Sequence, residues 1–157
     1  MIITYKDLLI YKLSGITEWK NEKEMILPSE YISGAALHRT YEFLGDGKYV
    51  LREYFQNEQI FWKSEYQNDE AHGLYLGWHD NGQLHWRKEL RNGHIHGIDV
   101  GWWRNGRQHW RTEFQNSIIC GEDLVWYKSG LPKSIRGWKN GERYSEMRWD
   151  ENGKRVL

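Results

Sequence analysis

The chain has 157 residues with 22 basic and 22 acidic side chains, so its formal net charge is zero and it lacks the positive field that attracts nucleic acids. Its single cysteine, Cys120, excludes an intramolecular disulfide framework and suits a reducing compartment. The 10 Trp, 10 Tyr and 16 Gly against 2 Pro indicate many short strands and tight turns, with little helix.

Residues 1–30 are expected to form a degenerate repeat that caps the N-terminal end of an array. The segment 18–21 (EWKN) resembles 137–140 (GWKN) near the other end of the chain, and capping repeats are atypical because one of their faces meets water. The apolar runs within residues 1–13 are brief and interrupted by charges, so we predict neither a signal peptide nor a membrane span there. We therefore expect a cytoplasmic protein, in the host cytoplasm if its source is a virus.

Residues 31–157 are expected to form the array itself, with about five units of which the last is partial. The clearest units are 78–97 (WHDNGQLHWRKELRNGHIHG) and 102–121 (WWRNGRQHWRTEFQNSIICG), which repeat with a period of about 24 residues. Each unit contains two turn signals, such as Asn81-Gly82 and Asn92-Gly93, because Asn and Gly tolerate the left-handed conformations of hairpin turns. The predicted fold is therefore all-β, an elongated array of stacked antiparallel β-hairpins.

The register of each hairpin decides which face of the sheet is apolar, because a shift of one residue turns every side chain over. A three-residue first turn with Gly82 in the left-handed conformation places Trp78 opposite Leu84 and Leu76 opposite Trp86. This register predicts one continuous apolar face, made of Leu76, Trp78, Leu84, Trp86 and Leu90 and repeated by Val100, Trp102, Trp110 and Phe114.

The opposite face is expected to carry a strip that binds a partner. The first strands of successive units place one ring in a column there, and the second strands add alternating charges, with equivalent residues roughly 10 Å apart. Aromatic side chains and arginines are enriched at the contacts that dominate protein interfaces. The predicted contact residues are Phe55, His79, Trp103, Tyr127, Arg87, Arg111, Glu89 and Glu113.

The two central units resemble MORN repeats. The pattern Trp78-x-x-Asn81-Gly82-x-Leu84, followed by Leu90-x-Asn92-Gly93-x-x-His96-Gly97, is similar to the variant found in bacterial YwqK-type antitoxins and in the MORN-repeat families of giant viruses. The resemblance covers about residues 31–157, and it implies an elongated ribbon of hairpins that binds partners without catalytic activity. Proteins of this kind are associated with scaffolding and with phospholipid contact. The chain departs from the pattern at three turn glycines and at one histidine, which are replaced by Glu58, Asp69, Ser117 and Cys120.

Three patterns raise the question of metal or catalytic chemistry. His94 and His96 alternate on one strand, but zinc requires three or four converging ligands, and the column of His96 also holds lysine and tyrosine in other units. Cys120 as a nucleophile requires an activating base and an orienting group, whereas a free cysteine usually packs as a small hydrophobe. The repeated glutamates alternate with arginines, which indicates a surface charge ladder and not a hydrolytic pair. We therefore expect no enzyme, no cofactor and no metal site.

The sequence favours a protein that binds and masks, or scaffolds, a protein partner in the manner of an antitoxin, an inhibitor or an effector. The alternative is a peripheral module that binds phospholipid membranes, which requires a concentrated basic patch. A single-layer array leaves its edges and an aromatic face open, so a homodimer through the terminal repeat or the tryptophan face is also expected. Aromatic and arginine side chains suit single-stranded nucleic acid as well, but the zero net charge disfavours it.

Overall fold

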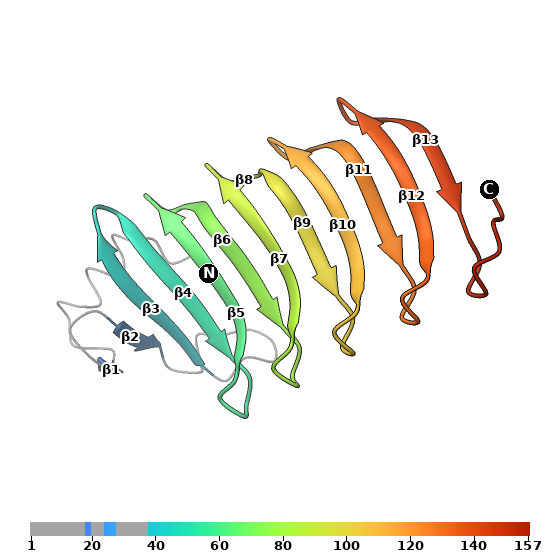
Figure 1. Cartoon of the computed structure of the whole chain (residues 1–157). Coiled ribbons are helices and arrows are strands. Elements are labelled where there is room, and N and C mark those ends of the chain that lie inside the picture. Colours follow the sequence, from blue (N-terminus) through green and yellow to red (C-terminus); the bar gives the residue numbers. More distant parts are fainter. Residues whose placement is uncertain (1–17, 20–23, 28–37) are drawn as a thin grey trace.

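The computed structural model describes residues 18–19, 24–27 and 38–157, which form one antiparallel sheet of thirteen strands (Figure 1). The prediction of an all-β array of stacked hairpins is confirmed. None of the described residues belongs to a helix, so no membrane-spanning helix is found among them. The strands are β1 (Glu18–Trp19), β2 (Glu24–Leu27), β3 (His38–Gly45), β4 (Lys48–Tyr54), β5 (Ile60–Gln67), β6 (Glu70–Trp78), β7 (Leu84–Arg91), β8 (His94–Ile95), β9 (Gly97–Trp102), β10 (Gln108–Gln115), β11 (Ile118–Trp126), β12 (Pro132–Lys139) and β13 (Glu142–Arg148).

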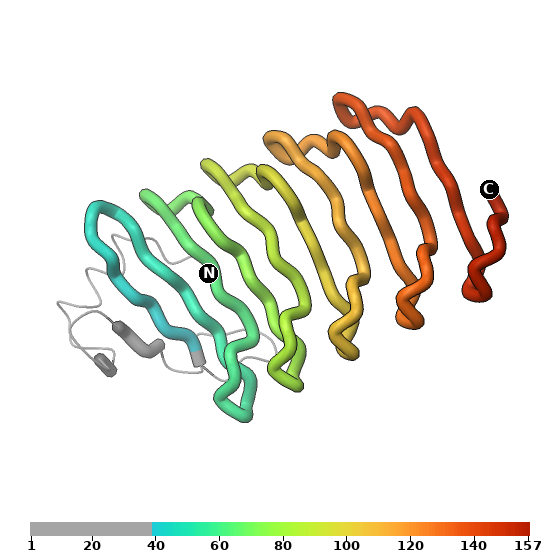
Figure 2. Tube along the Cα trace, viewed as in Figure 1, coloured from blue at the N-terminus to red at the C-terminus, as the bar shows by residue number. Residues whose placement is uncertain are grey.

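The chain runs back and forth, so that each strand lies beside the next one along the sequence, apart from the short β8, which pairs with β7 (Figure 2). This is the arrangement of a repeat protein, in which each unit contacts its immediate neighbours. The described part of the predicted cap, β1 and β2, extends the sheet beyond β3. The rest of residues 1–30, and residues 31–37 of the predicted array, lie outside the described part.

Two kinds of turn alternate along the array. At one end of the strands, Asn92 (φ 48°) and Gly93 (φ 73°) form a two-residue turn in the left-handed region, the conformation that matches the twist of a hairpin. At the other end, Gly82 (φ 81°) closes a three-residue turn in which the His79 N–H donates to the Gln83 carbonyl at 2.8 Å. The three-residue first turn and its left-handed Gly82 are therefore confirmed.

Glu58 stands where the later units have a left-handed glycine, as at Gly82, Gly106 and Gly130, and it keeps a positive φ of 63°. Because a side chain in this conformation is strained by roughly 1 kcal/mol, we expect Glu58→Gly to stabilise the chain by about that amount. The measurement is the midpoint of thermal or urea unfolding. Asn57→Gly is the matched control in the same turn, and it should lower the midpoint because the Asn57 carboxamide oxygen accepts the Gln59 N–H at 3.2 Å. Equal losses from both substitutions would contradict the strain argument.

The predicted register holds at the turn and fails one residue later. Trp78 lies opposite Leu84, as predicted, but Trp86 lies opposite Gly77, and Leu76 lies opposite Arg87. The pairing skips His85, which is the extra residue of a β-bulge. Such an insertion reverses the alternation of side chains beyond it.

The predicted continuous apolar face is therefore wrong. Since cross-strand partners share a face, Leu76 and Val100 lie with Arg87 on one side of the sheet. Trp86 and Trp110 lie on the other side, opposite glycines. The buried apolar residues are concentrated at the N-terminal end of the described array and include Tyr41, Tyr49, Val50 and Leu51.

Candidate functional site

Two tryptophans lie flat on the sheet because each is paired with a glycine. Trp110 lies opposite Gly101, where a Cβ would come within 2.2–2.4 Å of the Cη2, Cζ2 and Cζ3 ring atoms. Trp86 lies opposite Gly77, where a Cβ would come within 2.4–2.8 Å of Cε2, Nε1 and Cζ2. Three ring atoms at nearly equal distances from one point mean that the ring rests on the glycine with its flat side. The opposite side of each ring faces away from the sheet.

A row of stacked side chains stands beside these indoles, close to the three-residue turns. The second member of each pair is the extra residue of a bulge, and bulges recur at this position in all four hairpins from β4–β5 to β11–β12. Three pairs consist of two rings, and their ring centres are separated by 4.9 Å in Phe55 and Phe61, 4.1 Å in His79 and His85, and 3.5 Å in Trp103 and His109. In the fourth pair, the Lys133 ammonium lies 5.5 Å from the centre of the Tyr127 ring.

The stacked pairs form a wall over the indole floor. The His109 ring contacts the Trp110 ring at 4.9 Å with an angle of 73° between the planes, and the His85 ring contacts it at 6.2 Å with an angle of 76°. Because the Trp110 ring lies flat, these imidazoles stand upright next to it.

The same wall joins each repeat to the next through polar ring atoms. The nitrogen Nε2 of His79 lies 2.9 Å from the Trp102 carbonyl oxygen. In the next unit the Trp103 Nε1–H donates to the Trp126 carbonyl at 3.2 Å, and in the one after it the Tyr127 hydroxyl donates to the Trp149 carbonyl at 2.9 Å. These three members of the predicted strip therefore have a structural role between repeats.

Two polar side chains contact the indoles of the floor. The Lys88 ammonium lies over the Trp86 ring, 5.0 Å from its centre, and the Asp99 carboxylate accepts the Trp110 Nε1–H at 3.1 Å. Neither Lys88 nor Asp99 forms an ion pair within the described residues. We name this surface the indole trough: its floor is Trp86 and Trp110, its wall is the stacked pairs, and its polar border is Lys88 and Asp99.

At the N-terminal end of the trough, Trp62 lies between Glu53 and Gly77 on its two neighbouring strands, and its ring meets Tyr75 edge-on at 5.7 Å. A cavity of about 490 Å³ opens over this region. It is lined by Arg39, Glu53, Phe61, Trp62, Tyr75, Trp78, His85, Trp86 and Lys88.

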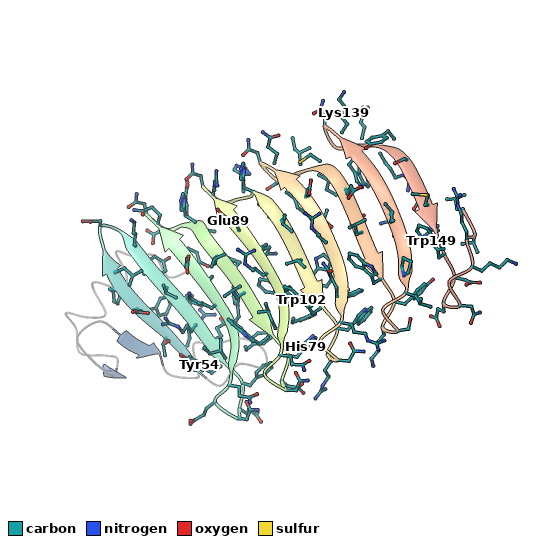
Figure 3. All side chains as sticks on the ribbon, in the orientation of Figure 1. Tyr54, His79, Glu89, Trp102, Lys139 and Trp149 are labelled. Carbon is teal, nitrogen blue, oxygen red and sulfur yellow. The ribbon has the colours of Figure 1, made fainter. Side chains whose placement is uncertain are left out.

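The eight predicted contact residues do not form one strip. The rings Phe55, His79, Trp103 and Tyr127 belong to the trough wall, whereas Arg87, Glu89, Arg111 and Glu113 lie on the opposite face. Figure 3 places His79 near the three-residue turns and Glu89 towards the other end of the strands. The bulge separates them, because it reverses the alternation between the two groups. That these residues contact a partner stays a prediction.

On the opposite face, charges pair locally along each strand. Lys63 and Glu65 are 2.9 Å apart, as are Arg111 and Glu113, whereas Glu89 pairs with Arg91 at 3.5 Å. Partly exposed pairs of this kind contribute little to stability. Within the described part of the chain, no group of three or more potential metal ligands comes together.

Two wall histidines make the array sensitive to acid. Burial lowers the pKa of both His85 and His109, and the neighbouring His79 and Lys133 respectively lower it further. As pH falls below about 6.5, the unfolded chain therefore binds more protons than the folded chain, so stability is full above about pH 6.5 and declines towards the lower folded pKa values. We expect a lower melting temperature at about pH 5.5 than at about pH 7.5.

The matched variant replaces both imidazoles with phenyl rings, His85→Phe with His109→Phe, because Phe61 already occupies this position in an earlier hairpin. The variant should lose part of the acid sensitivity. An unchanged difference in melting temperature between the two pH values would contradict the assignment to these histidines.

Lys88, Asp99 and the two flat indoles were not predicted from the sequence to form one surface. The signal for it was present: Gly77 and Gly101 recur at the repeat period, each paired with a tryptophan. Comparison of the chain with protein-family models, with curated proteins and with solved structures returns no match.

Proposed function

We propose that this chain is a non-catalytic repeat protein of MORN type that binds and masks, or scaffolds, a protein partner along the indole trough. The observation that carries the proposal is the pair of flat indoles, Trp86 and Trp110, on a face over which no other described strand lies. Both are partly exposed. Large flat aromatic surfaces with a polar border are typical of the anchor regions of protein interfaces.

The form of the surface favours binding over catalysis. An active site usually requires a concave pocket with converging polar groups. The cavity at the N-terminal end of the trough contains Arg39 and Glu53, but these two form an ion pair with each other. Of the other acids on this face, Asp123 and Glu146 are held by Arg136 at 2.9 Å each, and Asp99 accepts an indole N–H. Carboxylates held in this way serve the sheet as cross-strand links.

The two halves of the predicted strip have different places in this proposal. Phe55, His79, Trp103 and Tyr127 offer ring edges along the wall and belong to the same binding surface as the indoles. Arg87, Arg111, Glu89 and Glu113 lie on the other face, and they form a second surface suited to scaffolding. Because the surfaces are on opposite sides, each can be changed without touching the other.

The test is affinity capture with the tagged full chain from cells of its source, with quantification of bound proteins by mass spectrometry. Three baits are compared: the natural chain, a trough variant with Lys88→Glu and Asp99→Lys, and an opposite-face variant with Arg111→Ala. Circular dichroism checks that all three are folded. A partner lost by the trough variant and kept by Arg111→Ala supports the proposal. A partner lost by Arg111→Ala alone moves the site to the other face.

The phospholipid alternative is tested with the same proteins. Sedimentation with vesicles of phosphatidylserine and phosphatidylcholine separates membrane binding from protein binding, since attraction to an anionic bilayer weakens with salt. Salt-sensitive vesicle binding without any captured protein would overturn the proposal.

A further inference from the structure

We propose that the indole trough binds a proline-rich segment of the partner in the polyproline II conformation, laid across the strands along the axis of the array. The inference rests on the proposed function and names the kind of segment that the trough recognises. It is carried by the spacing of the two flat indoles and by the polar groups between them.

The spacing matches one turn of a polyproline II helix. Trp86 lies on β7 and Trp110 on β10, with β9 between them, so the two rings are two strand spacings apart. Two spacings are about 9.6 Å. A polyproline II helix has three residues per turn and rises about 3.1 Å per residue, so equivalent side chains recur about every 9.3 Å. Every third residue of such a segment therefore meets an indole.

The floor suits proline rings in particular. Each indole lies flat on a glycine, so it presents a flat outer side of the size that a pyrrolidine ring covers. Proline-rich segments dock in aromatic-lined grooves of this form, because their conformation exists before binding and little entropy is lost. The upright imidazoles of His85 and His109 limit the trough on one side and hold the segment along the array.

The polar border supplies a hydrogen-bond donor for the backbone of such a segment and a carboxylate for a basic residue next to it. A polyproline II helix has no internal hydrogen bonds, so its carbonyl groups need donors. The Lys88 ammonium lies over the Trp86 ring at the end of a flexible side chain, so it can move aside from the ring and donate to them. Asp99 accepts one hydrogen bond from Trp110 and has no ion pair among the described residues, so its carboxylate is available to a basic side chain next to the prolines.

A glycan is the other ligand class that stacks on indoles, and the trough suits it less. Selective recognition of hydroxyl groups requires several free, precisely placed polar partners. In the row that continues Lys88 and Asp99 across the sheet, Thr112, Asp123, Arg136 and Glu146 already bond one another. Beside the flat rings, Lys88 and Asp99 are therefore the charges of this row without an ion pair among the described residues, which favours the peptide.

The probes are two synthetic peptides of identical composition, titrated into the full chain by calorimetry and by observation of the indole N–H resonances in NMR spectra. The first peptide has four Pro-Ala-Ala units followed by Lys. The second has the same residues with the prolines placed as two Pro-Pro pairs separated by three alanines, so that no two prolines are three residues apart. We expect the first to bind at least about tenfold more tightly and to shift the Trp86 and Trp110 indole resonances.

Variants locate the binding. Asp99→Lys should weaken the first peptide by about tenfold or more, and Lys63→Ala on the opposite face should leave its affinity unchanged. Equal affinity of the two peptides, or unchanged binding by Asp99→Lys, would overturn the inference. If a captured partner needs the trough but neither peptide binds, this inference fails while the proposed function stands. If cellohexaose shifts the same resonances and no protein is captured, both fail.

Discussion

Adding a single methyl group at Gly101 is expected to destabilise the array by about 2 kcal/mol, the usual cost of overpacking a tight contact. A Cβ at this position would come within 2.2 Å of Cη2 of Trp110, a distance that real structures do not show, and the rigid indole has to leave its place on the strand. Gly101 does not have a positive φ, so Gly101→Ala adds the steric conflict without backbone strain. The measurement is the free energy of unfolding in urea.

The control is the same substitution in a background that lacks the indole. Trp110→Leu replaces the flat ring with a smaller, flexible side chain, so Gly101→Ala should cost little in that protein. The difference between the two backgrounds is the coupling energy of a double-mutant cycle, and we expect it to exceed about 1 kcal/mol. If Gly101→Ala costs the same in both backgrounds, the glycine is not required by the ring.

The hairpin architecture could be predicted from local chemistry alone. Asn and Gly at the two turns require left-handed backbone, and both turn types appear as expected. The conformation persists even where glycine is replaced, as at Asp69 (φ 65°) and Ser117 (φ 63°). In the case of Ser117 a compensation exists, since its hydroxyl accepts the Ile95 N–H of the previous repeat at 3.0 Å.

Which side chains share a face of the sheet could not be predicted in the same way, because this depends on a single extra residue, the β-bulge. Strict alternation places Trp86 with Leu76, and nothing within β7 alone indicates that His85 is skipped. A glycine on the neighbouring strand is not the cause, since the same bulge occurs in β4–β5 and β11–β12, where Trp62 lies opposite Glu53 and Ser134 opposite Val125. The bulge accompanies the three-residue turn in all four hairpins, and it separates the ring column from the charged column.

The second large effect is expected at Asp123, which links three strands. Its carboxylate accepts the Thr112 hydroxyl at 2.8 Å and the Arg136 guanidinium at 2.9 Å, and Asp123 is 9% exposed. Arg136 also binds Glu146, and this hydrogen bond, helped by other arginines, lowers the pKa of the Glu146 carboxyl. Asp123→Ala leaves a buried hydroxyl without its acceptor and removes one of the two carboxylates from Arg136. We expect a loss of about 2–3 kcal/mol in the free energy of unfolding.

Glu113→Ala is the matched control, because it also removes a carboxylate from an arginine pair at 2.9 Å. The side chains of Arg111 and Glu113 are 30% and 38% exposed, so water replaces much of the lost interaction, and the expected loss is about 0.5 kcal/mol. Equal losses from the two substitutions would contradict the argument from burial. The difference between the two sites also bears on function. If the charges opposite the trough contribute little to folding, they are free to vary with a partner. Asp123 and Arg136, in contrast, hold together the sheet on which the indoles rest.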